Sequence, residues 1–411
     1  MTELQRNFWL TLIGRSISRL GNTFHFLALS LMIYAKTESA LSVGQAMVAT
    51  TLPMLIVGPL AGVWIDRLDK RKLAVICEIL RGLTVLAIPF MPDVRLMYLF
   101  AFLSSMIGNI SNTAQSALTP QLFPREELLG YNAKIQTAIQ TMGIVGPILA
   151  GLVVSMWGYT AAFVVDFATF VLSALTLALL IVPKWIAPSD TEREKSQFWR
   201  ELSEGATYMV RQPRVMNAIL IMFTAMALSG MFNVLFIVFS KDIIAVTDRQ
   251  FGWLEAGIGI GLALGAFLMN FAKRIDLLLF VRLGMIVDAL LISALGYLVH
   301  SFYAEWVVVV GFGVCTVFAM IAAATIIQTE TDPQYMGRVM GFYDTIFMAG
   351  TVLSMALAGV VETVFTVREI FIYGGLVTAG LIALLSLKRL PKAAETPVPA
   401  SSSSSAVESA S

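Results

Sequence analysis

Long apolar stretches alternate with short polar connections along this chain of 411 residues. Each stretch approaches the roughly 20 apolar residues that an α-helix needs to cross the hydrocarbon core of a bilayer. Six of them come before a polar segment that begins at Lys184, and they cover residues 8–34, 43–65, 73–91, 96–118, 135–157 and 160–183. Six follow that segment and cover 215–240, 251–272, 277–299, 305–327, 342–361 and 369–387. The pattern predicts an all-α membrane protein with 12 transmembrane helices.

Lysine and arginine are distributed unevenly between the two sides of the predicted membrane. Of the 28 basic residues, 19 lie in connections on the side that holds both chain ends, and 5 lie on the opposite side. The other four lie inside the predicted helices: Arg15, Arg19, Arg81 and Arg282. Because cytoplasmic loops carry the excess of Lys and Arg, we expect a multi-pass protein of the cytoplasmic membrane with both termini in the cytoplasm.

The two sets of six stretches correspond to each other at an offset of about 208 residues. The basic connection 66–72 is matched by 273–276, and the segment from Pro124 to Gly151 by the one from Pro333 to Gly359. We therefore expect two pseudo-symmetric bundles, 1–183 and 215–387. A cytoplasmic linker, 184–214, joins them and contains an amphipathic surface helix over 196–211. The serine-rich tail 388–411 is typical of disorder.

Composition narrows the class of protein. Hydrophobic residues make up 57% of the chain, charged residues 13%, and the mean hydropathy is +0.80, whereas soluble domains carry about 25% charged residues. Two cysteines and two histidines offer no metal or cofactor site, and we expect no nucleic-acid partner. No nucleophile–base constellation and no phosphate loop occur, so a membrane-embedded enzyme is disfavoured.

The connection after the second stretch carries a distinctive pattern. Gly62 is followed by Asp66, Arg67 and Arg71. A glycine at a helix end allows close backbone approach, and an acid among bases can form a latch that closes in one conformation. This pattern resembles motif A of the major facilitator superfamily. The resemblance implies a cytoplasmic gate, with Asp69 standing where many members have glycine.

A second pattern lies in the fifth stretch, where small residues and a proline recur at Gly143, Gly146, Pro147 and Gly151. Small residues permit close helix contact, and proline bends the helix. Ordinary small-residue packing explains part of the pattern. It also resembles motif C of the same superfamily, which is associated with exporters, with Ala150 replacing a glycine of the fuller pattern.

Three further segments narrow the resemblance to the macrolide-efflux and enterobactin-exporter branch. They are 16–22, 124–128 and 163–170. Asn22 in the first of them replaces an acid that often follows this glycine in the family. The resemblance implies a proton-coupled exporter of amphiphilic small molecules that works as a monomer by rocking of its two halves. A catecholate siderophore exporter is the alternative.

Ionisable residues within membrane helices are costly unless they are paired or hydrated, so they point to function. Glu78 and Arg81 are three apart and can share a helix face. Arg282 and Asp288 are six apart, and each needs a partner elsewhere. Arg15 and Arg19 can face Glu78 or an anionic part of a substrate. We interpret these groups as structural bridges or substrate contacts.

Two acids lack a basic neighbour in the sequence, and we predict that they carry protons. Asp166 lies in the sixth stretch and Glu255 early in the eighth. An acid in a buried cavity can load and release a proton during the transport cycle. A hydrogen-bonded structural role for each is the competing interpretation.

Methionine and phenylalanine are concentrated in the seventh stretch, which lines the central cavity in this family. Flexible, polarisable side chains suit a pocket for varied apolar compounds. We therefore predict that the substrate cavity includes Asn22, Met222, Met226, Phe232 and Phe236, although plain packing can explain each of the four apolar side chains.

Overall fold

A computed structural model describes residues 2–65, 68–124, 127–182, 209, 212–269, 271, 276–298, 300–332 and 335–387. In these ranges the chain is helical and contains no strand. The helices of the first half are α1 (Glu3–Thr37), α2 (Ala40–Ile65), α3 (Lys70–Ala87), α4 (Val94–Leu122) and α5 (Leu128–Ala178). Those of the second half are α7 (Pro213–Val238), α8 (Asp248–Met269), α9 (Leu277–Leu298), α10 (Phe302–Glu330), α11 (Met336–Glu362) and α12 (Val367–Leu387). The 3₁₀ turn η1 (Ile88–Phe90) follows α3, and the π-turn η2 (Phe239–Ile243) follows α7.

Polar residues in the connections fix where several helices begin. The Thr2 hydroxyl accepts a hydrogen bond from the Gln5 amide and forms a capping box. Asp69 accepts from the amides of Arg71 and Lys72 at the start of α3. Such caps satisfy amide groups that lack partners within the helix. The basic connection therefore also ends one helix and starts the next.

The described helices are suited to a membrane, and the all-α fold agrees with the prediction. Ten of them are long and apolar enough to cross a bilayer. The count includes α5 once and does not include α1, which carries Arg15 and Arg19. At 51 residues α5 covers two predicted stretches, and its backbone breaks at Gly158, with φ 79° and ψ 177°. Glycine tolerates this positive φ. The number twelve stays a prediction.

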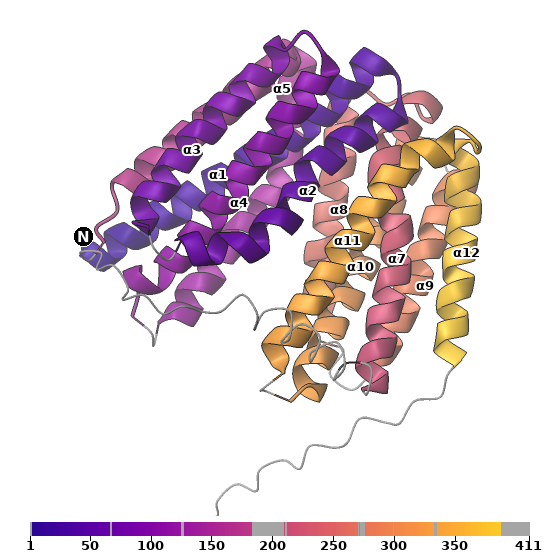
Figure 1. Cartoon of the computed structure of the whole chain (residues 1–411). Coiled ribbons are helices and arrows are strands. Elements are labelled where there is room, and N and C mark those ends of the chain that lie inside the picture. The colour runs from indigo at the N-terminus through magenta and orange to yellow at the C-terminus, as the bar shows by residue number, and fades with distance from the viewer. Residues whose placement is uncertain are drawn as a thin grey trace, which may run out of the picture.

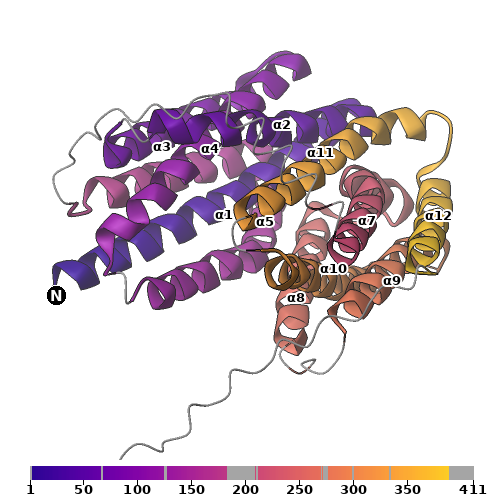
Figure 2. The ribbon, with the colours of Figure 1, turned by 60° about the horizontal axis from the view of Figure 1, so that its bottom comes forward.

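Figure 1 shows the helices in two groups, with α1 to α5 on the left and α7 to α12 on the right. The turned view keeps the same division (Figure 2). Each group buries apolar side chains between its own helices, and a third cluster of apolar residues includes members of both groups. The predicted linker helix over 196–211, apart from Met209, and the tail 388–411 lie outside the described residues.

The two groups touch through glycines near the start of α8 and near the end of α11. A Cβ added to Gly252 of α8 would lie 2.4 Å from the Pro147 carbonyl oxygen of α5. One added to Gly359 of α11 would lie 2.2 Å from Cα of Leu41 in α2. The distribution of basic residues predicts that these ends of α8 and α11 are extracellular. At the opposite end the two groups of helices diverge (Figure 1).

Candidate functional site

A cavity of about 440 Å³ lies among the helices of the first half and reaches one residue of the second. It is lined by Arg19, Asn22, Thr23, His25, Phe26 and Leu27 of α1, Thr50 and Thr51 of α2, Arg81 of α3, Ser105, Gly108, Asn109 and Asn112 of α4, Gly143 of α5 and Glu255 of α8. Polar and charged side chains predominate. Cavities of this size hold small-molecule ligands, so this is the candidate substrate site.

Helix α1 presents one continuous face to the cavity. Arg19, Asn22, Thr23 and Phe26 are spaced by three and four residues, which places them above one another on one side of a helix. The prediction that Asn22 belongs to the cavity agrees with this arrangement. Thr50, Asn109 and Asn112 were not singled out from the sequence, because isolated amides and hydroxyls in apolar helices carry little signal without a spatial partner.

Arg81 is held firmly at the cavity wall. Its Nη2 donates to Oδ1 of Asn22, and its guanidinium lies 4.5 Å from the centroid of the Phe170 ring, a cation–π contact. A Cβ added to Gly108 would lie 2.7 Å from Cζ of Arg81. Glycine at 108 therefore makes room for the guanidinium.

Glu78 does not take Arg81 as its hydrogen-bond partner, in contrast to the predicted pairing. Its carboxylate is fully buried and accepts from the hydroxyls of Ser111 at 2.7 Å and Ser18 at 3.3 Å. The amide of Gln115 adds a third bond at 3.4 Å. The helix face that the two residues share turns between α1 and α4, where hydroxyl and amide groups reach the carboxylate. Glu78 is thus a structural acid that joins α1, α3 and α4.

Asp166 lies behind the cavity wall, next to a histidine. The side chain is fully buried, and its Oδ2 lies 3.5 Å from Nδ1 of His25. His25 itself lines the cavity and meets Phe163 edge-on. Sequence reasoning missed His25 because it precedes Asp166 by 141 positions. The pair gives the buried acid a titratable neighbour that reaches the cavity.

The remaining predicted charges divide between the cavity and the bundle interior. Glu255 is the residue of α8 that lines the cavity. Asp288 of α9 is buried and accepts from the Thr316 hydroxyl at 2.7 Å, away from the cavity. Arg15 donates to the Thr119 hydroxyl at 3.2 Å, whereas Arg19, one turn further on, faces the cavity.

The apolar candidates on α7 lie elsewhere. Met222, Met226, Phe232 and Phe236 are each at most 4% exposed, and none of them lines this cavity. Phe232 stacks on Phe236 with centroids 4.8 Å apart and touches Phe312 at the same distance. Because α7 is covered by its neighbours in the second half, its side chains pack a core. The four α7 side chains therefore lie outside this polar cavity, and their role in a substrate site stays a prediction.

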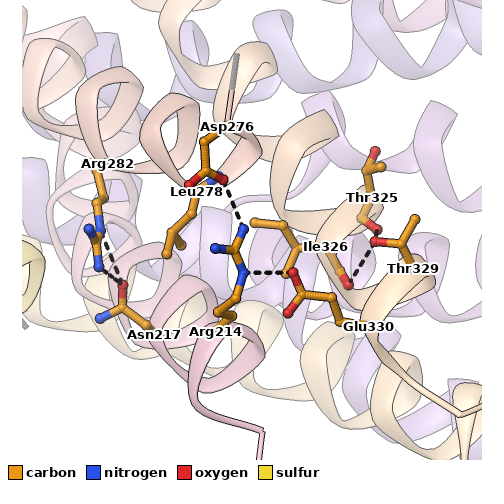
Figure 3. Close-up of polar contacts among 9 residues, drawn as sticks. All are labelled: Arg214, Asn217, Asp276, Leu278, Arg282, Thr325, Ile326, Thr329 and Glu330. Atoms are coloured by element: carbon orange, nitrogen blue, oxygen red, sulfur yellow. Dashed lines mark hydrogen bonds and ion pairs between the residues drawn. The ribbon is translucent and has the colours of Figure 1, made fainter. Parts of the chain in front are cut away.

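A cluster of charges ties helix ends together in the second half (Figure 3). Arg214 of α7 donates from Nε to Glu330 at 2.7 Å and from Nη2 to Asp276 at 2.8 Å. Arg282 donates to the Asn217 carbonyl oxygen at 3.0 Å. Burial opposes ionisation of Asp276, but hydrogen bonds from Arg214 and the Leu278 amide outweigh it and hold the pKa of this carboxyl below its ordinary value. Arg282, which the sequence predicts to need a partner outside its own helix, thus meets the side-chain amide of Asn217 on α7.

The motif A residues are only partly described. Gly62 lies in the last turn of α2, and Asp66 and Arg67 lie outside the described residues. Arg71 donates to the Ala178 carbonyl at the end of α5. Asp69 caps α3 through the amides described above. In the described part, this connection therefore joins the ends of α3 and α5, and the predicted gate stays a prediction.

The helix-5 residues lie where α5 meets α1 and α8. A Cβ on Gly146 would lie 1.9 Å from Oγ1 of Thr23, and one on Gly151 would lie 3.0 Å from Cα of Gly252. Gly143 faces Arg19, whose Nη2 would lie 3.5 Å from such a Cβ. The motif therefore shapes both the cavity wall and the contact between the two halves.

Several known transporters are similar in sequence to this chain over most of its length. The macrolide efflux protein A of Streptococcus pyogenes is 27% identical over 364 residues, which is 85% of this chain and 86% of that protein. Enterobactin exporter EntS of Salmonella typhimurium is 26% identical over 413 residues, 95% and 94% of the two chains. The uncharacterized MFS-type transporter YfiS of Bacillus subtilis is 24% identical, covering 93% and 94%.

Solved structures share the fold. A bacterial homologue of the human lysosomal transporter Spinster, in an inward-facing and unoccupied conformation, aligns with a TM-score of 0.71 and 13% identity over 94% of this chain and 95% of that one. A variant of the nucleoside transporter NupG aligns with a TM-score of 0.72 and 15% identity, covering 93% and 100%. The sequence model of the Major Facilitator Superfamily matches residues 11–348. The chain is therefore a multi-pass membrane transporter and belongs to the Major Facilitator Superfamily.

Proposed function

We propose that this transporter exports amphiphilic small molecules, such as macrolide-type drugs, across the cytoplasmic membrane in exchange for protons. The observation that carries the proposal is the cavity, whose wall comes from α1 to α5 except for Glu255, an acid supplied by α8 of the other half. Rocking of the two halves would move this acid relative to the other wall. Substrate occupancy and protonation can then be linked through one space.

Two acids are the proposed proton carriers. Glu255 is in direct reach of cavity water, and Asp166 is reached through His25, whose Nδ1 lies 3.5 Å from its carboxylate. Both acids lack an arginine or lysine among their hydrogen-bond partners in the described part of the chain. An acid free of such a pair can change its protonation as access alternates.

The direction of transport rests on the helix-5 glycines and on the relatives. Close packing of α5 on α8 at Gly151 and Gly252 holds the two halves together at the predicted extracellular end, while the helices diverge at the cytoplasmic end (Figure 1). Relatives named for efflux and export support the same direction. We further propose that the chain acts as a monomer and catalyses no covalent reaction.

Export of a catecholate siderophore is the second candidate. The specific observation in its favour is that Arg19 and Arg81 both line the cavity, since guanidinium groups bind oxyanions well. The name of EntS, the enterobactin exporter, supports the same candidate.

Transport in proteoliposomes with an imposed pH gradient tests the proposal. A panel of macrolides, cationic dyes and catecholate siderophores would be loaded, and movement recorded with and without the gradient. We expect gradient-driven transport that falls strongly in Glu255→Gln. Transport that ignores the gradient would remove proton coupling. Full activity in the double variant Glu255→Gln, Asp166→Asn would remove both carriers while leaving the fold assignment intact.

A further inference from the structure

We propose that Arg19 and Arg81 form a subsite for an anionic group, so that the preferred cargo is an amphiphile that carries an oxyanion such as a carboxylate. This inference rests on the proposed export of amphiphiles through the same cavity, and within that proposal it favours an anionic cargo, such as the catecholate candidate, over a basic macrolide. Three features of the cavity wall carry it: Arg81 is fixed in place with a free donor, Arg19 has no partner among the described residues, and the nearby acids do not line the cavity.

Arg81 has an unused donor in the right place. The side chain lines the cavity; its Nε is sealed against Gly108, whereas its Nη1 makes no hydrogen bond with the described residues and is not sealed in this way. Asn22 and Phe170 fix the guanidinium on its other sides. A guanidinium N–H group that has no protein acceptor and borders a cavity is available to a ligand. A bound oxyanion would supply that acceptor.

Arg19 provides the second positive charge. It lies one turn before Asn22 and Thr23 on the cavity face of α1, and it makes no hydrogen bond or ion pair with the described part of the chain. Gly143 leaves the space beside its guanidinium open. An arginine held in a pocket with free donors is well suited to bind an oxyanion with two hydrogen bonds.

The acids near these arginines do not cancel them at the cavity surface. Glu78 and Asp166 are both fully buried, and neither lines the cavity. Glu78 is occupied by hydroxyl and amide donors. Among the described residues, Glu255 is the acid that does line the cavity, and it belongs to the opposite half. Among the described residues, the wall formed by α1, α3 and α4 therefore presents two guanidinium groups and no carboxylate to the cavity, although Glu78 and Asp166 interact electrostatically with Arg81 from behind it.

The rest of the lining fits an amphiphile. Phe26 and Leu27 of α1 offer apolar contact next to the arginines, and the amides of Asn109 and Asn112 lie on the adjacent helix. A cationic molecule placed at the same wall would be repelled by two guanidinium groups in a space partly removed from water. The arrangement favours an apolar body with a negative group.

Xanthene dyes test this inference because they share one ring system and differ in charge. Fluorescein is anionic, and rhodamine 6G is a cation. Binding to purified protein in detergent, followed by fluorescence polarisation without any gradient, should favour fluorescein. We expect Arg19→Gln to weaken fluorescein binding by about tenfold, as for a charged hydrogen bond, and to leave rhodamine 6G binding unchanged or stronger.

Arg15→Gln is the matched control, because Arg15 lies one turn away and is bound to Thr119. The fluorescein affinity of this variant should stay within about twofold of wild type, as for a distant site. Arg81→Lys keeps the charge but loses the planar fork, and it should also weaken fluorescein binding. Equal effects of Arg15→Gln and Arg19→Gln, a preference for rhodamine 6G, or no saturable fluorescein binding would overturn the inference.

Transport of the same dyes separates this inference from the proposed function. If binding follows the expected order but no dye moves under a pH gradient, proton-coupled export fails and the subsite stands. If dyes move under the gradient and Arg19→Gln transports fluorescein and rhodamine 6G in the wild-type ratio, the subsite fails and proton-coupled export stands.

Discussion

The two halves of this transporter place their polar residues differently. In the first half the charged side chains Arg19 and Arg81 face a cavity. In the second half Arg214 binds Asp276 and Glu330 at the ends of three helices. Aromatic rings of α7 pack on each other and on Phe312 of α10. The first half thus directs charged side chains toward a cavity, whereas the described charges of this second-half cluster bind one another.

Two residue pairs about 208 positions apart show how the two halves differ in charge. Arg81 lies against Gly108, and Asp288, 207 positions later, binds Thr316, which is 208 positions after Gly108. The same place in the repeat holds a cation beside a glycine in one half and an acid bound to a hydroxyl in the other. If the two halves are repeats, as the sequence predicts, the helix contact is similar in both, whereas the charge and its access to the cavity differ.

The largest effect is expected where the two halves touch. In Gly252→Leu the new side chain would begin 2.4 Å from the Pro147 carbonyl oxygen, and neither backbone can yield easily. Overpacking of this kind costs about 1–3 kcal/mol or more, and we expect transport to fall by at least about tenfold. Efflux from cells at equal protein level measures it.

Gly380→Leu on α12 is the control for this prediction, because a Cβ there meets no atom within 4 Å. It should transport like the wild type. Wild-type efflux by Gly252→Leu would show that transport does not require the close contact of α5 and α8 between the two halves.

The next largest effect is expected in the charge cluster of the second half. Arg214→Gln leaves Asp276 and Glu330 facing each other without the cation. Because Asp276 is 51% exposed, the loss should be about 1–2 kcal/mol rather than the larger cost of a buried pair. Thermal unfolding in detergent measures it. Lys72→Gln in the first half, where the lysine is 80% exposed and 3.8 Å from Asp69, should cost less than about 0.5 kcal/mol; equal losses would contradict the comparison.

A smaller, pH-dependent effect should come from Asp276. Its pKa in the folded protein lies below the ordinary value, so its stabilising contribution is present above the unfolded-state pKa of about 3.9 and is lost as the pH falls through the folded value. Asp276→Asn should therefore lower the unfolding midpoint at pH 7, and the difference from wild type should vanish at acid pH. A difference that grows on acidification would have the wrong sign.

The smallest effect is expected for the methionines of α7. Met222→Leu and Met226→Leu conserve volume in a packed core, which costs less than about 1.5 kcal/mol, and transport of each dye should stay within about twofold of wild type. Asn22→Ala removes the acceptor of Arg81 and should change dye preference instead. A change of preference in the methionine variants would return α7 to the substrate site.

Much of the fold could be predicted from the sequence, because hydropathy and the placement of Lys and Arg follow directly from the physics of the bilayer. The turn at Gly158 separates the two predicted stretches now found in α5. The site was less accessible. Arg15 and Arg19 look alike in sequence, yet one turn of helix decides that the first meets Thr119 and the second a cavity. His25 pairs with Asp166 only through tertiary packing. The α7 rings pack a core rather than line this cavity, and the sequence could not distinguish the two because apolar residues suit a core and a pocket equally well.

The glycine contacts between α5 and α8 also determine how far the far end of α8 would move when the helix tilts. Met269, at the far end of α8, lies 17 residues beyond Gly252, a lever of about 26 Å at 1.5 Å per residue. If α8 tilted by about 10° about this contact, its far end would move by roughly 4–5 Å, and the contact itself would hardly move. Because glycines let the backbones of α5 and α8 touch directly, a small tilt of α8 at this contact would open a gap at the opposite membrane surface.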